Sequence, residues 1–223
     1  MTKKLFLEAI AKFSLGVVLV GALIFLPAGT MDYFGGWLLM GILFVPMFLA
    51  GLVMMAKSPS LLRSRLDAKE KRSQQDMVVK LSGLMFLAGF ILAGLDHRFG
   101  WSKLPGSVNL IGAVLFLSSY ALYAEVLREN IWLSRTIQVQ ENQTVVSTGL
   151  YGIVRHPMYF ATVILFLSMP IVLGSLPALL VFLCYPFLIA RRIADEEKLL
   201  EAELRGYAEY KQKVRWRLIP YIW

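Results

Sequence analysis

The sequence predicts an all-α integral membrane protein with five to six transmembrane helices, including a carboxyl-terminal helical hairpin. Of its 223 residues, 57% are hydrophobic and 17% are charged, whereas a soluble domain has roughly 45–50% apolar and about 25% charged residues. Apolar runs recur along the chain, and each membrane pass needs about 20 residues. This composition excludes a large water-soluble catalytic domain, so any chemistry must lie at helix ends or in the polar connections.

Four apolar runs predict the first four membrane helices, at residues Ala9–Ala28, Gly36–Ala56, Val78–Leu95 and Ser107–Leu127. No small-residue cleavage pattern closes the first run, so we expect a retained helix rather than a cleaved signal. The connection at 57–76 mixes both charge signs without an extended apolar face, which predicts a solvated loop near lipid headgroups. We expect residues 1–129 to form one unit that shapes the acceptor side, and 130–223 to form a second that holds the cofactor region.

The fifth apolar region, Met158–Ala190, is long for one pass and short for two. Pro170, Gly174 and Pro177 interrupt it, and because proline removes a backbone donor and glycine lets the chain turn, a tight helical hairpin is favoured over one kinked helix. The single cysteine, Cys184, lies within this run. It excludes a disulfide framework and a multi-thiolate metal site, and we expect it to be a small buried hydrophobe.

Basic residues predict the orientation of the helices. The amino terminus, the two long connections and the tail carry 21 of the 23 Lys and Arg residues, whereas the other side carries Arg98 and Lys103. Cytoplasmic connections accumulate Lys and Arg, so both termini are expected in the cytoplasm. This topology requires the fifth region to return, which favours the hairpin independently.

Two polar segments on the predicted cytoplasmic side are candidates for a functional site. The first, Asn130–Tyr159, contains a β-like stretch at Thr144–Ser147 and then Arg155-His156-Pro157 before the hairpin. Proline fits the first turn of a helix, so His156 is expected at a helix start. The alternative is purely structural: Arg155 reaches lipid headgroups, His156 caps the helix and Tyr159 joins an interfacial aromatic belt.

The second segment, Arg191–Glu197, leaves the other arm of the hairpin. Helical spacing places Arg192 and Glu196 on one face, flanked by Asp195 and Glu197. A solvated helix with ion pairs is the simpler interpretation, but an acidic cluster beside the membrane opposes the local preference for basic residues. If the hairpin forms, this acidic segment and the Arg-His-Pro segment emerge side by side.

These residues carry a resemblance to a known family. The run VVSTGLYGIVRHPMY, followed by RRIADEEKLL and GYAEYKQKVRWRLIP, resembles the two ordered motifs of the isoprenylcysteine carboxyl methyltransferase family, and NIWLSRTIQVQ is similar to its bacterial and archaeal-type members. The resemblance covers Asn130–Trp223. It implies an integral-membrane enzyme that uses S-adenosylmethionine in a cytoplasm-facing pocket, with a lipophilic or lipidated substrate entering from the bilayer (the inner or cytoplasmic membrane in a bacterium).

The resemblance also implies site residues. Arg192 corresponds to the contact for the substrate carboxylate, and Arg192 and Glu196 are the candidate catalytic residues. Either glutamate of the pair could contact the cofactor, because the spacing to Tyr207 differs from that of the family. The implied cofactor-binding residues are Gln138, Gln143, Thr144, Val145, Val146, Tyr151, His156, Pro157, Met158, Tyr159, Glu196 and Glu197.

Methyl transfer is an in-line displacement, so the enzyme chiefly aligns the reacting groups. A carboxylate acceptor is ionised near neutral pH and needs no general base, which favours it over the amine of a phospholipid headgroup or a small thiol. An NADPH-dependent sterol-type reductase and a non-catalytic membrane scaffold remain alternatives. The sequence has no glycine-rich phosphate loop and no metal-ligand spacing, and its basic, aromatic tail suits a lipid anchor better than a nucleic-acid site.

Overall fold

The structure, a computed structural model, describes residues 3–66, 73–133 and 139–223. Within these ranges the chain is helical and contains no strand, and five helical segments are long and apolar enough to cross a membrane. The predicted all-α membrane class is therefore confirmed. The elements are α1 (Lys3–Ala28), α2 (Phe34–Lys57), α3 (Pro59–Leu66), α4 (Ser73–Phe99), α5 (Gly106–Glu129), the 3-10 helix η1 (Gly149–Gly152), α6 (Pro157–Leu173), α7 (Leu176–Phe182), α8 (Tyr185–Glu203) and α9 (Tyr207–Lys213).

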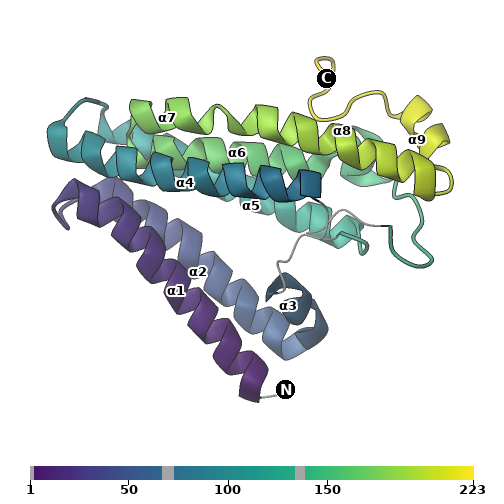
Figure 1. The fold of residues 1–223 in the computed structure, drawn as a ribbon, viewed down its shortest axis with the longest axis horizontal. Coiled ribbons are helices and arrows are strands. Elements are labelled where there is room, and N and C mark those ends of the chain that lie inside the picture. Colours follow the sequence, from purple (N-terminus) through teal and green to yellow (C-terminus); the bar gives the residue numbers. More distant parts are fainter. Residues whose placement is uncertain (1–2, 67–72, 134–138) are drawn as a thin grey trace.

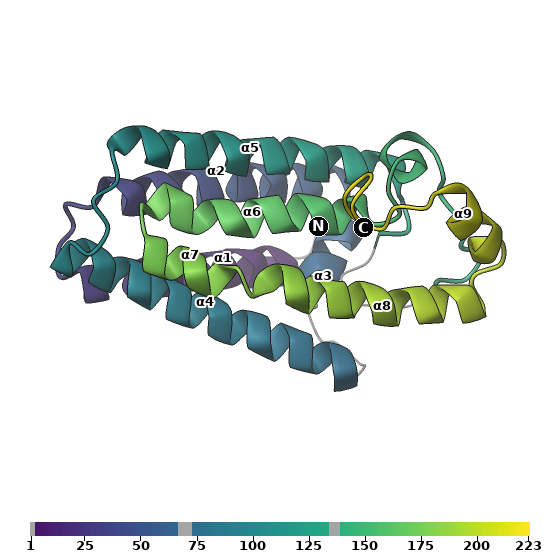
Figure 2. The same ribbon diagram turned by 90° about the horizontal axis from the view of Figure 1, so that it is seen from above.

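Helices α4 to α8 run alongside one another, whereas α1 and α2 diverge from them as a pair (Figure 1). Helix α6 lies between α5 and the line of α7 and α8 (Figure 2), and it also contacts α2 and α4. Its 17 residues rise by about 26 Å, less than the roughly 30 Å of a hydrocarbon core. The described ranges thus contain five helical segments of membrane-spanning length and a sixth, shorter apolar helix, α6, at the centre.

The predicted helical hairpin forms between α6 and α7. The chain reverses at Gly174, whose φ of 70° is the left-handed conformation that glycine adopts without strain. Ser175 then caps α7, since its side chain accepts a hydrogen bond from the Ala178 nitrogen. Pro170 remains inside α6 and Pro177 lies in the first turn of α7, so the turn itself needs only two residues.

The end of α6 at this turn is held by the side chains of Tyr33, which directly precedes α2, and Asn109 of α5. The Tyr33 hydroxyl donates to the Leu173 carbonyl at 2.7 Å, and Asn109 Nδ2 donates to the Val172 carbonyl at 2.7 Å. These carbonyls belong to the last turn of α6 and have no partner within that helix. Gly112 of α5 allows the close approach here, because a Cβ atom at Gly112 would lie 2.6 Å from the Val172 nitrogen.

The prediction of a solvated loop at 57–76 is wrong for the part of this connection that the structure describes. Residues Pro59–Leu66 form α3, and Leu62 packs against Leu5 of α1 and Met55 of α2. Leu62 and Leu66 lie four residues apart on one helical face, a short apolar stripe that the surrounding charges obscure. Residues 67–72 lie outside the described ranges.

Two smaller predictions also fail. Cys184, which lies between α7 and α8, is exposed rather than buried. The β-like stretch at Thr144–Ser147 forms no strand: its backbone has no strand partner among the described residues.

The close contact of α5 with α6 predicts that Gly112→Ala destabilises the protein. The added methyl overlaps the α6 backbone, and overpacking of this kind costs about 1–3 kcal/mol. We expect a lower thermal melting midpoint in detergent. Gly83→Ala is the matched control, since a Cβ atom there meets no described atom within 4 Å. Equal melting of both variants would contradict this packing.

Candidate active site

The polar end of α6 is built by three consecutive residues, Arg155, His156 and Pro157. Pro157 is the first residue of α6, and His156 precedes it with extended φ and no side-chain capping bond. The expectation that His156 marks a helix start is confirmed, but the alternative in which its side chain caps the helix is wrong. Its Nε2 instead lies 3.3 Å from Glu197 Oε1 of α8.

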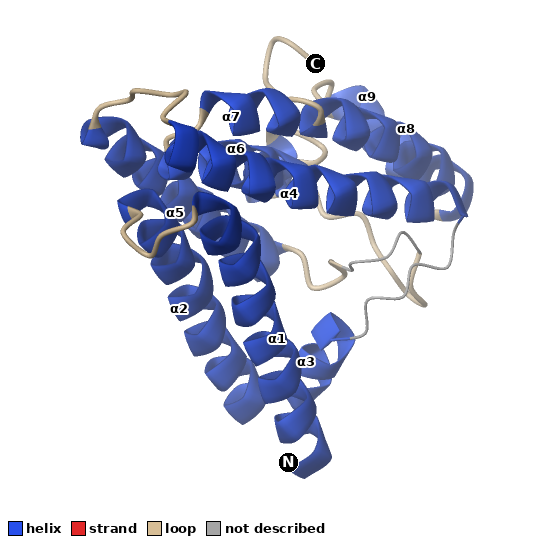
Figure 3. Ribbon diagram, turned by 60° about the vertical axis from the view of Figure 1, so that its left-hand side comes forward, coloured by secondary structure: helices blue, strands red, loops and turns tan. Residues whose placement is uncertain are grey.

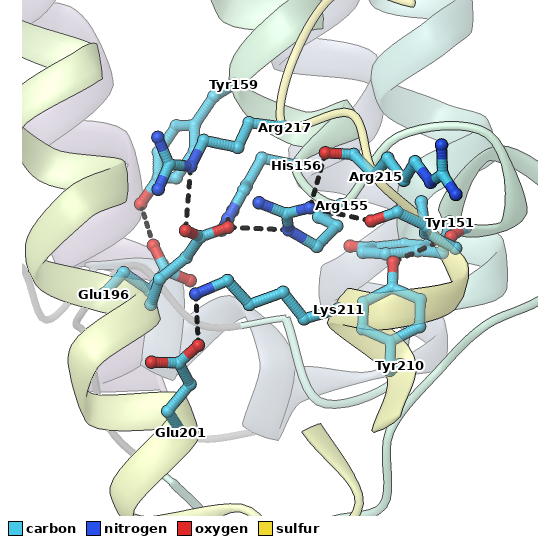
Figure 4. A network of polar contacts seen from close by, with 12 residues as sticks. Tyr151, Arg155, His156, Tyr159, Glu196, Glu201, Tyr210, Lys211, Arg215 and Arg217 are labelled. Atoms are coloured by element: carbon cyan, nitrogen blue, oxygen red, sulfur yellow. Dashed lines mark hydrogen bonds and ion pairs between the residues drawn. The ribbon is translucent and has the colours of Figure 1, made fainter. Parts of the chain in front are cut away.

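Glu197 is the centre of a buried ionic network. Arg155 Nε donates to its Oε1 at 2.7 Å and Arg217 Nε donates to its Oε2 at 2.8 Å (Figure 4). The side chains of Arg155 and Glu197 are 4% and 3% exposed. Arg155 therefore does not extend to lipid headgroups, which overturns that alternative. The acidic and basic segments meet, as the hairpin geometry led us to expect.

The tail beyond α9 completes this network. The backbone nitrogens of Arg155 and His156 donate to the carbonyls of Trp216 and Arg217, both at 2.9 Å. Arg155 Nη1 also donates to the Val214 and Arg215 carbonyls, each at 2.7 Å. The tail thus folds back over the start of α6, at the side of the bundle (Figure 3). Beyond the tail's place in the family motif, no feature of the sequence predicted this pairing.

A second chain of contacts joins α6 to α8. Arg192 Nε donates to the Tyr159 hydroxyl at 2.9 Å, and this hydroxyl donates to Glu196 Oε2 at 2.5 Å. Arg192 is 9% exposed. Arg192 and Glu196, which were predicted to share one helical face, are therefore connected through the Tyr159 hydroxyl. The two glutamates also have different partners: Glu196 contacts Tyr159, whereas Glu197 belongs to the ionic network.

A cavity of about 100 Å³ lies against these contacts, between α6, α8, α9 and the segment before η1. The predicted site residues that line it are Gln143, Thr144, Val145, Val146, Tyr151, His156, Met158, Tyr159 and Glu196. Pro157, Arg192 and Glu197 lie close by without lining it, and Gln138 lies outside the described residues. The lining residues that sequence reasoning missed are Asn130, Trp132, Leu133, Arg155, Leu200, Leu204, Tyr207 and Tyr210.

The paired tyrosines of the tail form one wall of the cavity. Gly206, with a φ of 87°, starts α9 and places Tyr207 and Tyr210 one turn apart. The Tyr210 hydroxyl donates to the Tyr151 carbonyl at 2.7 Å. The Tyr207 hydroxyl is buried and has no hydrogen-bond partner among the residues described. Burial, with the negative charge of Glu197, raises the pKa of Tyr207 above its ordinary value, so this hydroxyl is a protonated donor at neutral pH.

Residues 3–66, 73–133 and 139–223 contain no group of three His, Cys, Asp or Glu side chains arranged to hold a metal ion. The charged groups of the site are engaged with one another. What the arrangement offers a ligand is a carboxylate, aromatic faces and one unsatisfied hydroxyl.

The ionic network predicts that Glu197→Gln strongly destabilises the fold. The substitution leaves the buried Arg155 guanidinium without its counter-charge, and breaking a buried ion pair costs about 3–5 kcal/mol. We expect a large fall in the thermal melting midpoint. Glu201→Gln, on the same helix, removes a partly exposed pair with Lys211 and is expected to cost less than about 1 kcal/mol. Equal melting midpoints for the Glu197→Gln protein and the Glu201→Gln control would show that the network does not stabilise the fold.

Comparison with known proteins supports the interpretation of the motifs. Residues 110–202 match the model of the isoprenylcysteine carboxyl methyltransferase (ICMT) family. A stretch of 91 residues is 31% identical to the delta(14)-sterol reductase TM7SF2 of Mus musculus; it covers 40% of this chain but only 22% of that protein. Over α6, α8 and most of the cavity, the resemblance to the isoprenylcysteine carboxyl methyltransferase family is therefore confirmed.

Proposed function

We propose that this protein is an integral-membrane methyltransferase that transfers a methyl group from S-adenosylmethionine to the carboxylate of a lipophilic, isoprenylcysteine-like acceptor. The match to the ICMT family supports the methyltransferase class. One observation carries the residue assignment: Tyr159 joins Arg192 to Glu196, and Glu196 lines the cavity. In this proposal residues 130–223 hold the cofactor, residues 1–129 shape the acceptor side, and the cavity faces the cytoplasm.

The cavity residues fit S-adenosylmethionine in chemical character. When bound, this cofactor supplies an electrophilic methyl group on a positively charged sulfur. Glu196 presents a carboxylate to a cationic or polar part of it, and the unpartnered Tyr207 hydroxyl supplies a donor. The cavity of about 100 Å³ is smaller than the roughly 300–1,000 Å³ of ligand pockets. Binding of the cofactor therefore requires the cavity to widen.

Arg192 is proposed to hold the acceptor carboxylate. A guanidinium matches a carboxylate in a two-point geometry, which fixes the acceptor oxygen along the line of displacement. The bond from Arg192 Nε to Tyr159 limits the rotation of the side chain. Because the carboxylate is already ionised near neutral pH, no residue has to remove a proton. This favours a carboxylate over a phospholipid amine or a thiol.

The similarity to a sterol reductase supports a second candidate, an NADPH-dependent reduction. NADPH carries several negative phosphate charges, which need cationic partners. In the cavity Arg155 is bound to Glu197, and Glu196 adds a negative charge. The methyltransferase is therefore the better fit. Binding titrations with both cofactors separate the two: binding of NADPH alone would overturn the methyltransferase proposal.

The acceptor assignment predicts that Arg192→Gln lowers methyl transfer by about 10- to 100-fold, because a hydrogen bond to a charged group contributes about 1.5–3 kcal/mol. Purified protein in detergent is assayed with methyl-labelled cofactor and a carboxylate, an amine or a thiol acceptor. We expect labelling of the carboxylate and unchanged cofactor affinity in the variant. Arg191→Gln, at the exposed neighbouring position, is the control and retains activity. Labelling of the amine or thiol alone would remove the proposed acceptor.

The cofactor assignment predicts that Tyr207→Phe weakens S-adenosylmethionine binding by about 2- to 12-fold, the equivalent of one hydrogen bond of 0.5–1.5 kcal/mol. Isothermal titration calorimetry measures the dissociation constant. Tyr210→Phe is the matched control: it removes a hydroxyl that already binds the Tyr151 carbonyl, so it lowers the melting midpoint more than the affinity. An unchanged dissociation constant in Tyr207→Phe would mean that this hydroxyl does not contact the cofactor.

A further inference from the structure

A second cavity lies on the other side of the tail from the proposed cofactor site. It has a volume of about 540 Å³, and the buried Arg155 contributes to both cavities. The remaining residues that line it come from the end of α9 and the tail: Lys211, Gln212, Arg215, Trp216, Arg217 and Trp223. We call this second cavity the tail groove. The proposed methyl transfer makes no use of it.

The tail groove contains several cationic side chains, and not all of them are paired with a carboxylate. Lys211 pairs with Glu201, and Arg217 pairs with Glu197. Arg215 is exposed, and its guanidinium has no ion pair or hydrogen bond with any residue that the structure describes. In Figure 4 its carbonyl faces Arg155 while its guanidinium points away from the network. Arg155, which also lines the groove, shares Glu197 with Arg217. Among the described residues, the groove therefore presents the unpaired Arg215 beside three cations that already have a carboxylate partner.

Aromatic and apolar side chains surround these cations. The Arg217 guanidinium carbon lies 5.3 Å from the centre of the Trp223 ring, and Trp216 contacts Tyr221 at 5.5 Å between ring centres. Tyr221 and Ile222 are 87% and 74% exposed. Tryptophan and tyrosine settle at the interface between membrane and water, and Lys and Arg meet anionic headgroups there. The composition of the groove matches that interface.

The position of the groove in the fold agrees with its composition. Arg155 lies two residues before the start of the apolar helix α6, and α8 becomes polar from Arg191 onward. The groove therefore lies at the level where the membrane helices pass from apolar to polar sequence. The tail loop projects sideways from the helix bundle, across the direction of the helices (Figure 1). A loop in this position reaches the surrounding headgroup layer rather than the water beyond the helix ends.

We propose that the tail groove binds the phosphate of an anionic phospholipid headgroup, with Arg215 as its main contact and Tyr221 and Ile222 entering the interface beside it. The bound lipid anchors the tail, and the carbonyls of this tail hold Arg155 against the start of α6. An anionic lipid would thus stabilise the segment that closes one side of the proposed active site.

The test compares ligands on the purified full-length protein in neutral detergent, without cofactor or acceptor. The thermal melting midpoint is measured against added short-chain phosphatidylglycerol, short-chain phosphatidylcholine or inorganic phosphate, at constant ionic strength. We expect stabilisation by phosphatidylglycerol, and an apparent affinity that falls by about five-fold in Arg215→Gln. Lys213→Gln makes the same charge change at an exposed position that does not line the groove. We expect its effect to stay below about two-fold.

Three outcomes would overturn the proposal. Equal losses in the two variants would mean that the tail attracts anions only by diffuse charge. Equal stabilisation by phosphatidylcholine would mean that the groove does not select an anionic headgroup. Stabilisation by inorganic phosphate as strong as that by phosphatidylglycerol would mean that the occupant is a free anion. Because no methyl transfer is measured, failure here leaves the proposed function intact, and failure of that function leaves this result intact.

Discussion

The organisation of this protein at its polar end depends on one buried carboxylate. Glu197 of α8 accepts hydrogen bonds from Arg155, at the start of α6, and from Arg217, in the tail. Three segments far apart in the sequence are fixed to each other through its two oxygens. Removing these charged side chains from water is unfavourable by itself. The ion pairs among them, together with the hydrogen bonds from Arg155 to backbone carbonyls, offset this cost. The start of α6 and helix α8, which form two walls of the cavity, are held together by this network.

The network also explains why the adjacent residues Glu196 and Glu197 have different partners. Successive residues on a helix point about 100° apart, so when Glu197 faces the Arg155 side, Glu196 faces the cavity and Tyr159. The Tyr159 hydroxyl accepts from Arg192 and donates to Glu196. Tyr159 therefore positions the Arg192 and Glu196 side chains relative to each other. In the proposed reaction this links the group that holds the acceptor to the group that faces the cofactor.

Much of the fold could be predicted from the sequence because its determinants are local. Apolar length gives the membrane helices, and Gly174 between two prolines gives the hairpin, which in turn brings Arg155 and the acidic segment together. The tail's return over α6 could not be predicted, because it depends on backbone hydrogen bonds to Trp216 and Arg217, sixty residues away. For the same reason the sequence could not distinguish the positions of Glu196 and Glu197. It also could not show that the Tyr207 hydroxyl is buried without a hydrogen-bond partner among the described residues. The packing of α3 was missed because its apolar stripe is only two leucines long.

In the proposed function Glu196 faces the cofactor, whereas Glu197 stabilises the fold through its pairs with Arg155 and Arg217. The most direct measurement is the dissociation constant of S-adenosylmethionine for the wild-type protein and for Glu196→Gln, together with the melting midpoint of each in the absence of ligand. We expect Glu196→Gln to weaken binding by about ten-fold or more, because a charge-assisted hydrogen bond is lost, at a nearly unchanged melting midpoint. Wild-type affinity in Glu196→Gln, or a loss of stability without a specific loss of binding, would contradict it.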